Sequence, residues 1–152
     1  MAGFTSELQT AWMEDGRKRV LAPHRYSIGD KDSGLYIEAE TGFVSDITSI
    51  PWWLQPLIRK EGGEGPCSVI HDKAYKSGSM TVAATGEQVH LTQAFADSVF
   101  REAMRVPRKD GTLAVNPIRR EVLYWGLVFG GFVAWRKHRI ANQDREWTRE
   151  NT

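Results

Sequence analysis

The fold is organised by residues 67–76, whose sequence reads CSVIHDKAYK. The Ser77-Gly78 pair that follows is a helix-ending signal, so this stretch predicts a helix that stops there. Residues four apart share a helical face, so His71 and Tyr75 project together, while Asp72 points about 100° away. The helix therefore offers an imidazole and a carboxylate to two different neighbours.

A second helix is predicted from about Leu91 to Val106. Thr92 is suited to cap its N-terminus, and Pro107 ends it. Asp97 borders a face on which apolar side chains recur, and a carboxylate there is costly unless it is paired or hydrogen-bonded. The apolar side chains of that face are Phe95, Val99, Phe100, Ala103 and Met104.

Antiparallel packing of the two helices would bring Asp97 to His71 and Tyr75, and this trio is the candidate catalytic site. Histidine titrates near neutrality and can act as a general base for water, while a carboxylate on its other ring nitrogen fixes the tautomer. Asp72 would be left to bind a hard cation such as calcium (Ca²⁺) through oxygen. The alternative is that the same residues form a buried polar staple between helices.

A third helix is predicted from about Pro117 to Arg139, and its segment Val122–Trp135 is almost free of polar residues. Arginines and a lysine bracket this segment on both sides. Its fourteen residues would cover about 21 Å, less than the roughly 30 Å of a bilayer core, so no transmembrane span is expected. A buried core helix is the favoured interpretation, with membrane interaction as the alternative.

The first third of the chain is predicted to be β-rich, with short strands around residues 19–21, 25–28 and 35–40. The last of these alternates, which places Ile37 and Ala39 on one face and Glu38 on the other. The predicted fold class is α+β: a small N-terminal antiparallel sheet and a C-terminal three-helix assembly.

The expected organisation is a single domain over residues 1–152. It has a β-rich part to residue 50, a helical part over 51–140 and a polar tail over 141–152. A short helix is expected to start at Pro51, and a loop is expected around Gly86, between the first two long helices. The pair Trp52-Trp53 is interpreted as capping a core, with an exposed docking or lipid-facing patch as the alternative.

Composition excludes several classes of protein. The 152 residues carry a formal net charge of +1, so no global field favours nucleic acid, and none is expected as a partner. Cys67 is the only cysteine, so no intramolecular disulfide can form, and a buried apolar role is expected for it. The first residues lack the pattern of a secretory signal. His24, His90 and His138 are interpreted as surface residues.

The motif His71-Asp72-x-x-Tyr75, followed by Ala96-Asp97-x-x-Phe100, resembles the catalytic core of the phospholipase A2 group, particularly its compact viral branch. The resemblance covers about residues 62–104. It implies that His71 is the general base for water, that Asp72 binds calcium, and that Asp97 and Tyr75 orient the histidine. The glycines at 62, 63 and 65 only loosely match the calcium loop of that group.

A wider set of segments resembles a phage and prophage family of unknown function, domain of unknown function 1353. It includes Gly42-Phe43-Val44-x-Asp46-x-x-Ser49-Ile50-Pro51 and extends to about residue 135. The resemblance implies a bacteriophage origin and brings no established activity. Synthesis in the host cytoplasm is expected, and incorporation into the virion is a further expectation. Asp46 and Ser49 are further candidates: a turn-capping role is favoured, and contact with the His71 pocket is the alternative.

Two functions follow as expectations. The first is a phage-encoded hydrolase with a phospholipase A2-like His/Asp core that acts on the host envelope or on lipid. The second is a non-enzymatic virion or tail component that contacts other virion proteins. Accessibility separates them, because a base must open to a cleft, whereas a staple is sealed.

Overall fold

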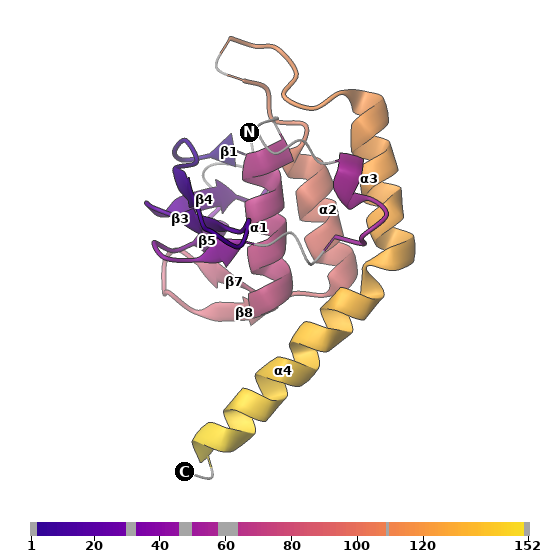
Figure 1. Cartoon of the computed structure of the whole chain (residues 1–152). Helices are drawn as coiled ribbons and strands as arrows, with labels where there is room; N and C mark the ends of the chain where they lie inside the picture. The colour runs from indigo at the N-terminus through magenta and orange to yellow at the C-terminus, as the bar shows by residue number, and fades with distance from the viewer. Residues whose placement is uncertain (1–2, 30–32, 46–49, 58–63, 109, 151–152) are drawn as a thin grey trace.

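The computed structural model describes residues 3–29, 33–45, 50–57, 64–108 and 110–150, and for residues 64 and 144–150 it describes the backbone alone. Figure 1 shows two antiparallel sheets, to which the N-terminal half contributes most of the strands, and long helices in the C-terminal half. The predicted α+β class is confirmed.

The larger sheet has five strands in the order β1-β4-β5-β7-β8, all antiparallel. Tyr26 pairs with Ile37 at its centre, and both side chains are buried. The alternation predicted for residues 35–40 is confirmed, because Ile37 and Ala39 face the interior. The strands are β1 (Gly3–Phe4), β4 (His24–Ser27), β5 (Leu35–Ala39), β7 (Ser79–Val82) and β8 (Gln88–His90).

The loop expected around Gly86 is confirmed at Gly86 itself, but the residues on either side of it form the strands β7 and β8 of a hairpin. Its sequence is rich in Ser, Thr and Gly, which is typical of a loop. The hairpin forms because β7 pairs with the edge of β5, where Leu35 lies opposite Val82. Tertiary pairing therefore overrides the local preference.

The smaller sheet consists of β2 (Thr10–Trp12), β3 (Lys18–Val20) and β6 (Val44–Ser45) in the order β2-β3-β6. A small apolar cluster joins it to the rest of the molecule. Its buried members come from both sheets, the turn before β6 and the first long helix: Val20, Ala39, Phe43 and Val69.

Four α-helices follow, after a short 3₁₀ helix at Gln55–Leu57 that begins later than the predicted start at Pro51. The predicted cap at Thr92 is confirmed, since its side chain accepts a hydrogen bond from the Phe95 amide. The helix predicted over 117–139 is two helices separated at Gly131. Residues 141–150, expected as a tail, continue the last helix. The four are α1 (Glu64–Ser77), α2 (Gln93–Ala103), α3 (Pro117–Gly130) and α4 (Phe132–Glu150).

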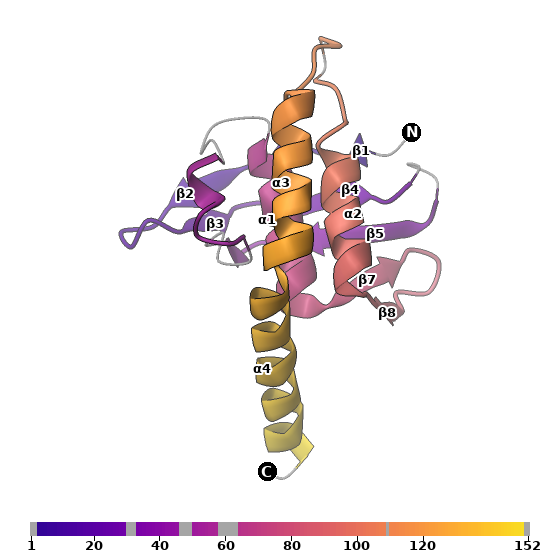
Figure 2. The ribbon, with the colours of Figure 1, turned by 90° about the vertical axis from the view of Figure 1, so that its right-hand side faces the viewer.

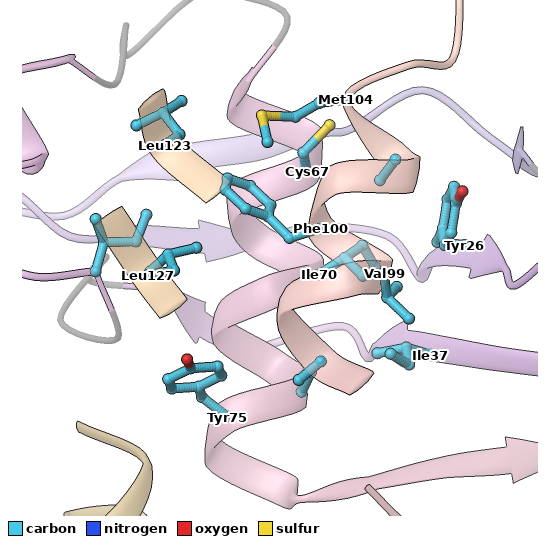
Figure 3. Close-up of a cluster of buried hydrophobic side chains, with 14 of the residues drawn as sticks. Tyr26, Ile37, Cys67, Ile70, Tyr75, Val99, Phe100, Met104, Leu123 and Leu127 are labelled. Carbon is cyan, nitrogen blue, oxygen red and sulfur yellow. The ribbon is translucent and has the colours of Figure 1, made fainter. Parts of the chain in front are cut away.

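The elements form layers, with α1 and α2 between the larger sheet and α3 (Figure 2). The main core fills the space between these layers, where Phe100 from α2 lies among side chains of α1 and α3 (Figure 3). Beyond its first turns, α4 leads away from the body of the molecule (Figure 1). Among the described residues, no helix combines the length and the apolar character needed to cross a bilayer.

The expectation that Val122–Trp135 is a buried core helix is wrong for most of the segment. Leu123 and Leu127 are buried against the core, but Trp125 and Phe129 on the other side of α3 are exposed. The reason is the layering, since α3 is the outermost layer and has protein on one side only (Figure 2). The break at Gly131 then turns Phe132 and Val133 outwards as well.

Candidate functional site

The structure brings together the three residues of the predicted catalytic trio. His71 Nε2 lies 3.1 Å from Asp97 Oδ1, and the Tyr75 hydroxyl donates a hydrogen bond of 2.6 Å to the same oxygen. His71 and Tyr75 lie one turn apart on α1, and Asp97 reaches them from the neighbouring helix α2. This is the contact that the two helical patterns predicted.

Aromatic packing fixes the imidazole in place. Its ring centroid lies 4.2 Å from that of Tyr75 and 4.8 Å from that of Phe100. An ionised carboxylate only accepts hydrogen bonds, so with Asp97 ionised the neutral ring carries its proton on Nε2. Nδ1 then presents a lone pair, and no hydrogen-bond partner for it lies within reach in the described part of the chain.

The trio is sealed from solvent. The side chains of His71 and Asp97 are 0% and 2% exposed. The α3–α4 junction closes over them: a Cβ added at Gly131 would lie 2.5 Å from the Tyr75 hydroxyl oxygen. Trp135, on the first turn of α4, packs edge-on against Tyr75 with ring centroids 5.2 Å apart. Only glycine fits at this point of the cover.

Burial and the negative charge of Asp97 raise the pKa of the Tyr75 phenol well above its ordinary value. The hydroxyl therefore stays protonated and remains a donor to Asp97 throughout the physiological range. The Tyr75 hydroxyl therefore holds the carboxylate in the orientation that the imidazole requires.

Asp72 is buried on α1, and its carboxylate lies 3.3 Å from Lys76 Nζ. Lys76 Nζ also donates to the backbone carbonyl of Val44, 3.0 Å away. Calcium requires six to eight oxygen ligands. Within the described ranges, no group of three or more His, Cys, Asp or Glu side chains is placed to hold a metal. Calcium binding at Asp72 stays a prediction.

Two of the other candidates, Asp46 and Ser49, lie outside the described residues. Cys67 is buried, as expected for a small apolar residue. His24 is buried as well, so its interpretation as a surface residue is wrong. Burial lowers the pKa of His24, and its ring stacks on Phe4 at 5.0 Å. The available signal was its strand position, two residues before the core residue Tyr26.

A polar pocket of about 450 Å³ lies beside the other face of α1. Lys73 and Ser77, which line it, project from the side of the helix opposite His71 and Tyr75. Its remaining lining comes from the strands and turn of the larger sheet, including Tyr36 and Gln88. This pocket does not reach the trio.

Comparison with known proteins gives one match. Residues 19–127 match the model of a family described as "Protein of unknown function (DUF1353)". The chain belongs to the DUF1353 family. The DUF1353 segment begins in β3, contains His71, Tyr75 and Asp97, and ends within α3, before the Gly131 junction. No curated protein and no solved structure matches the chain.

Proposed function

We propose that this protein is a phage-encoded hydrolase in which His71 activates water. The observation that carries the proposal is the asymmetric state of the imidazole. Asp97 holds one ring nitrogen, and Nδ1 has no partner among the described residues. A buried nitrogen without a hydrogen bond destabilises the folded protein by about 1–3 kcal/mol. A histidine that served only the stability of the fold would gain nothing from an unpaired Nδ1.

In this proposal, Nδ1 takes a proton from water as the water oxygen attacks an ester carbonyl. Asp97 stabilises the imidazolium that forms, and Tyr75 keeps Asp97 in place through its 2.6 Å hydrogen bond. The imidazolium then returns the proton to the leaving alkoxide. Because the His71 side chain is 0% exposed, substrate reaches Nδ1 only after the elements that cover the imidazole move away.

The substrate class rests on the resemblance of the His71-Asp72-x-x-Tyr75 and Asp97 motifs to the phospholipase A2 group. It favours an ester of a lipid or another component of the host envelope. The phage origin rests on the second resemblance, which includes the segment from Gly42 to Pro51. A calcium requirement through Asp72 stays a prediction, and no step above uses it.

The complete burial of the trio favours a second candidate, a non-enzymatic virion or tail component. Here His71, Tyr75 and Asp97 form a polar staple that fixes α1 against α2. The protein would be made in the host cytoplasm and assembled into the virion with other phage proteins. A staple needs no access to solvent, whereas a base does.

One experiment separates the two candidates. Fatty-acid release from phosphatidylglycerol vesicles is measured for the wild type, His71→Gln and His24→Gln, with calcium and with EDTA, alongside thermal unfolding. His24 is the matched control because it is an equally buried imidazole without a carboxylate partner among the described residues. If the hydrolase proposal is right, the wild type and His24→Gln release fatty acid, and His71→Gln folds but releases none.

The opposite result identifies the staple: no release by any of the three, with a lower Tm for His71→Gln. Loss of release in EDTA would support the calcium prediction, and unchanged release would refute it.

A further inference from the structure

The outer side of α3 and the start of α4 carry a continuous apolar surface, called here the α3–α4 face. Four of its residues follow each other along α3 at intervals of three or four, so they line the side opposite the buried Leu123 and Leu127, and two more lie at the start of α4. Phe129 is 74% exposed, and its ring stacks on that of Trp125 with centroids 6.3 Å apart. The face consists of Ile118, Val122, Trp125, Phe129, Phe132 and Val133.

A further tryptophan, Trp53, extends the face. A Cβ added at Gly130 would lie 3.4 Å from the Trp53 ring, so the turn that carries Trp53 lies against the end of α3. Trp53 is about half exposed, and its neighbour Trp52 is 80% exposed. Soluble proteins rarely leave so many large apolar side chains together in water unless the surface has a partner.

Positive charge accompanies the same segment. Residues 117–143 carry five basic and one acidic side chain, a net charge of +4 in a chain whose total is +1. The acidic one, Glu121, is held in ion pairs by Arg101 and Arg120. Arg136 and Lys137, just beyond the apolar residues, are exposed. The apolar face is therefore bordered by two exposed cations at its α4 end and by the half-buried Arg119 at the start of α3.

We propose that the α3–α4 face docks on the surface of an anionic lipid bilayer. Aromatic and branched apolar side chains would enter the boundary between headgroups and acyl chains, and the arginines and lysine would contact the lipid phosphates. Charge decides against a second copy of this chain. Two such faces packed in either direction would bring a cationic end of one against a cationic end of the other, with no free acidic side chain in the described part of the segment to offset them.

The inference concerns the surface alone and stands whether or not His71 is a base. Binding is measured by sedimentation with vesicles of phosphatidylcholine, and of phosphatidylcholine mixed with phosphatidylglycerol. We expect binding to the anionic vesicles, weaker binding to the neutral ones, and a decrease as salt is raised. His71→Gln is expected to bind like the wild type, so failure of the hydrolase proposal leaves this result unaffected.

Two double variants test the apolar contribution. Trp125→Ser with Phe129→Ser should weaken binding by about tenfold or more, because two insertion residues are lost. The control, Trp12→Ser with Leu113→Ser, removes two large apolar side chains that are also about half exposed but lie elsewhere. It should bind like the wild type. If the first variant does not fold, Phe129→Ser alone carries the test.

A charge reversal tests the cationic border. Arg136→Glu with Lys137→Glu should lose most of the salt-dependent binding, while Arg17→Glu with Arg19→Glu, which changes the net charge equally on the smaller sheet, should lose much less. Equal losses in both would overturn the proposal, as would absence of wild-type binding to anionic vesicles. Sedimentation equilibrium that shows a dimer abolished by the Trp125/Phe129 variant, without vesicle binding, would assign the face to a second copy.

Discussion

The α3–α4 layer covers polar side chains on its inner side and exposes apolar ones on its outer side, the reverse of the usual distribution in a folded protein. Beneath the junction lies a polar trio that is sealed from water, with His71 and Asp97 almost completely buried. On the outside lies an apolar face that includes Trp125 and Phe129. Gly131 separates the two regions, since it touches Tyr75 on the inside and is followed on the outside by Phe132.

The two reversals have different energetic consequences. A buried polar network stabilises the fold only while every partner is present, so loss of one member costs far more than an average contact. An exposed apolar side chain makes few contacts in the free protein, so its removal leaves the free energy of unfolding almost unchanged. The inner region is therefore visible in stability measurements, and the outer region in binding measurements.

A second buried tyrosine shows what is particular to the trio. Tyr26 donates a 2.7 Å hydrogen bond to Glu102 Oε1, and the Gly29 amide donates to the same oxygen at 2.8 Å. This pair joins the larger sheet to α2 and contains no imidazole. It is a tyrosine–carboxylate staple of the ordinary kind, whereas the trio adds a histidine with one ring nitrogen left open.

The largest effect is expected for Asp97→Ala. It removes the acceptor of both the Tyr75 hydroxyl and His71 Nε2 and leaves two buried groups without a partner. The free energy of unfolding should fall by about 3–5 kcal/mol, measured by urea denaturation. A double-mutant cycle supplies the control: Tyr75→Phe should cost much less in the Asp97→Ala background than in the wild type. Independent costs would show that the trio is not a network.

A smaller effect is expected for Gly131→Ala, which tests the cover between the two regions. The new Cβ would lie 2.5 Å from the Tyr75 hydroxyl oxygen and 2.8 Å from the Leu127 carbonyl oxygen. Both neighbours are fixed, so the junction must shift, at a cost of about 1–3 kcal/mol in unfolding free energy. Gly130→Ala is the control, because its nearest neighbour, Pro51, is 3.0 Å away. A larger loss at position 130 would contradict the proposed role of Gly131.

The trio of the inner region could be predicted from the sequence, because the helical spacing of its residues determines which side chains face one another. His71 and Tyr75 are one turn apart, and Asp97 lies on the apolar side of α2, so packing of the two helices leaves few other arrangements. His24 escaped notice because its strand has only four residues, too short for its alternation to be distinctive. Asp72 shows a missed signal, because Lys76 lies four residues later on the same helical face and the i,i+4 spacing points to this ion pair.

The outer region could not be derived from the sequence, because an apolar run looks the same whether it faces a core or a partner. Leu127 and Phe129 belong to the same run, yet only their placement relative to α2 decides which is buried. The β7–β8 hairpin depends on the free edge of β5. Each of these outcomes is set by tertiary contacts.

His24, another buried polar group, is expected to make the free energy of unfolding depend on pH in the acid range. Burial lowers the pKa of His24 in the folded protein below its ordinary value, so between that lowered pKa and about 6.5 the unfolded chain binds more protons. The stability that His24 contributes is complete above pH 6.5 and is lost as the pH falls through this window. Urea denaturation at several pH values should show a smaller decline for His24→Phe than for the wild type. Parallel declines would refute the assignment.

The smallest effect on stability is expected on the outer face, for Phe129→Ser. The side chain is 74% exposed and its main ring contact is Trp125, so the free energy of unfolding should change by no more than about 0.5 kcal/mol. Leu127→Ala, two residues earlier and fully buried, should cost about 2–5 kcal/mol in the same denaturation experiment. A large loss for Phe129→Ser would mean that this side chain belongs to the core in solution. The expected contrast between neighbouring positions would instead show that the fold gains nothing from the aromatic ring at 129, which leaves its role to whatever binds the face.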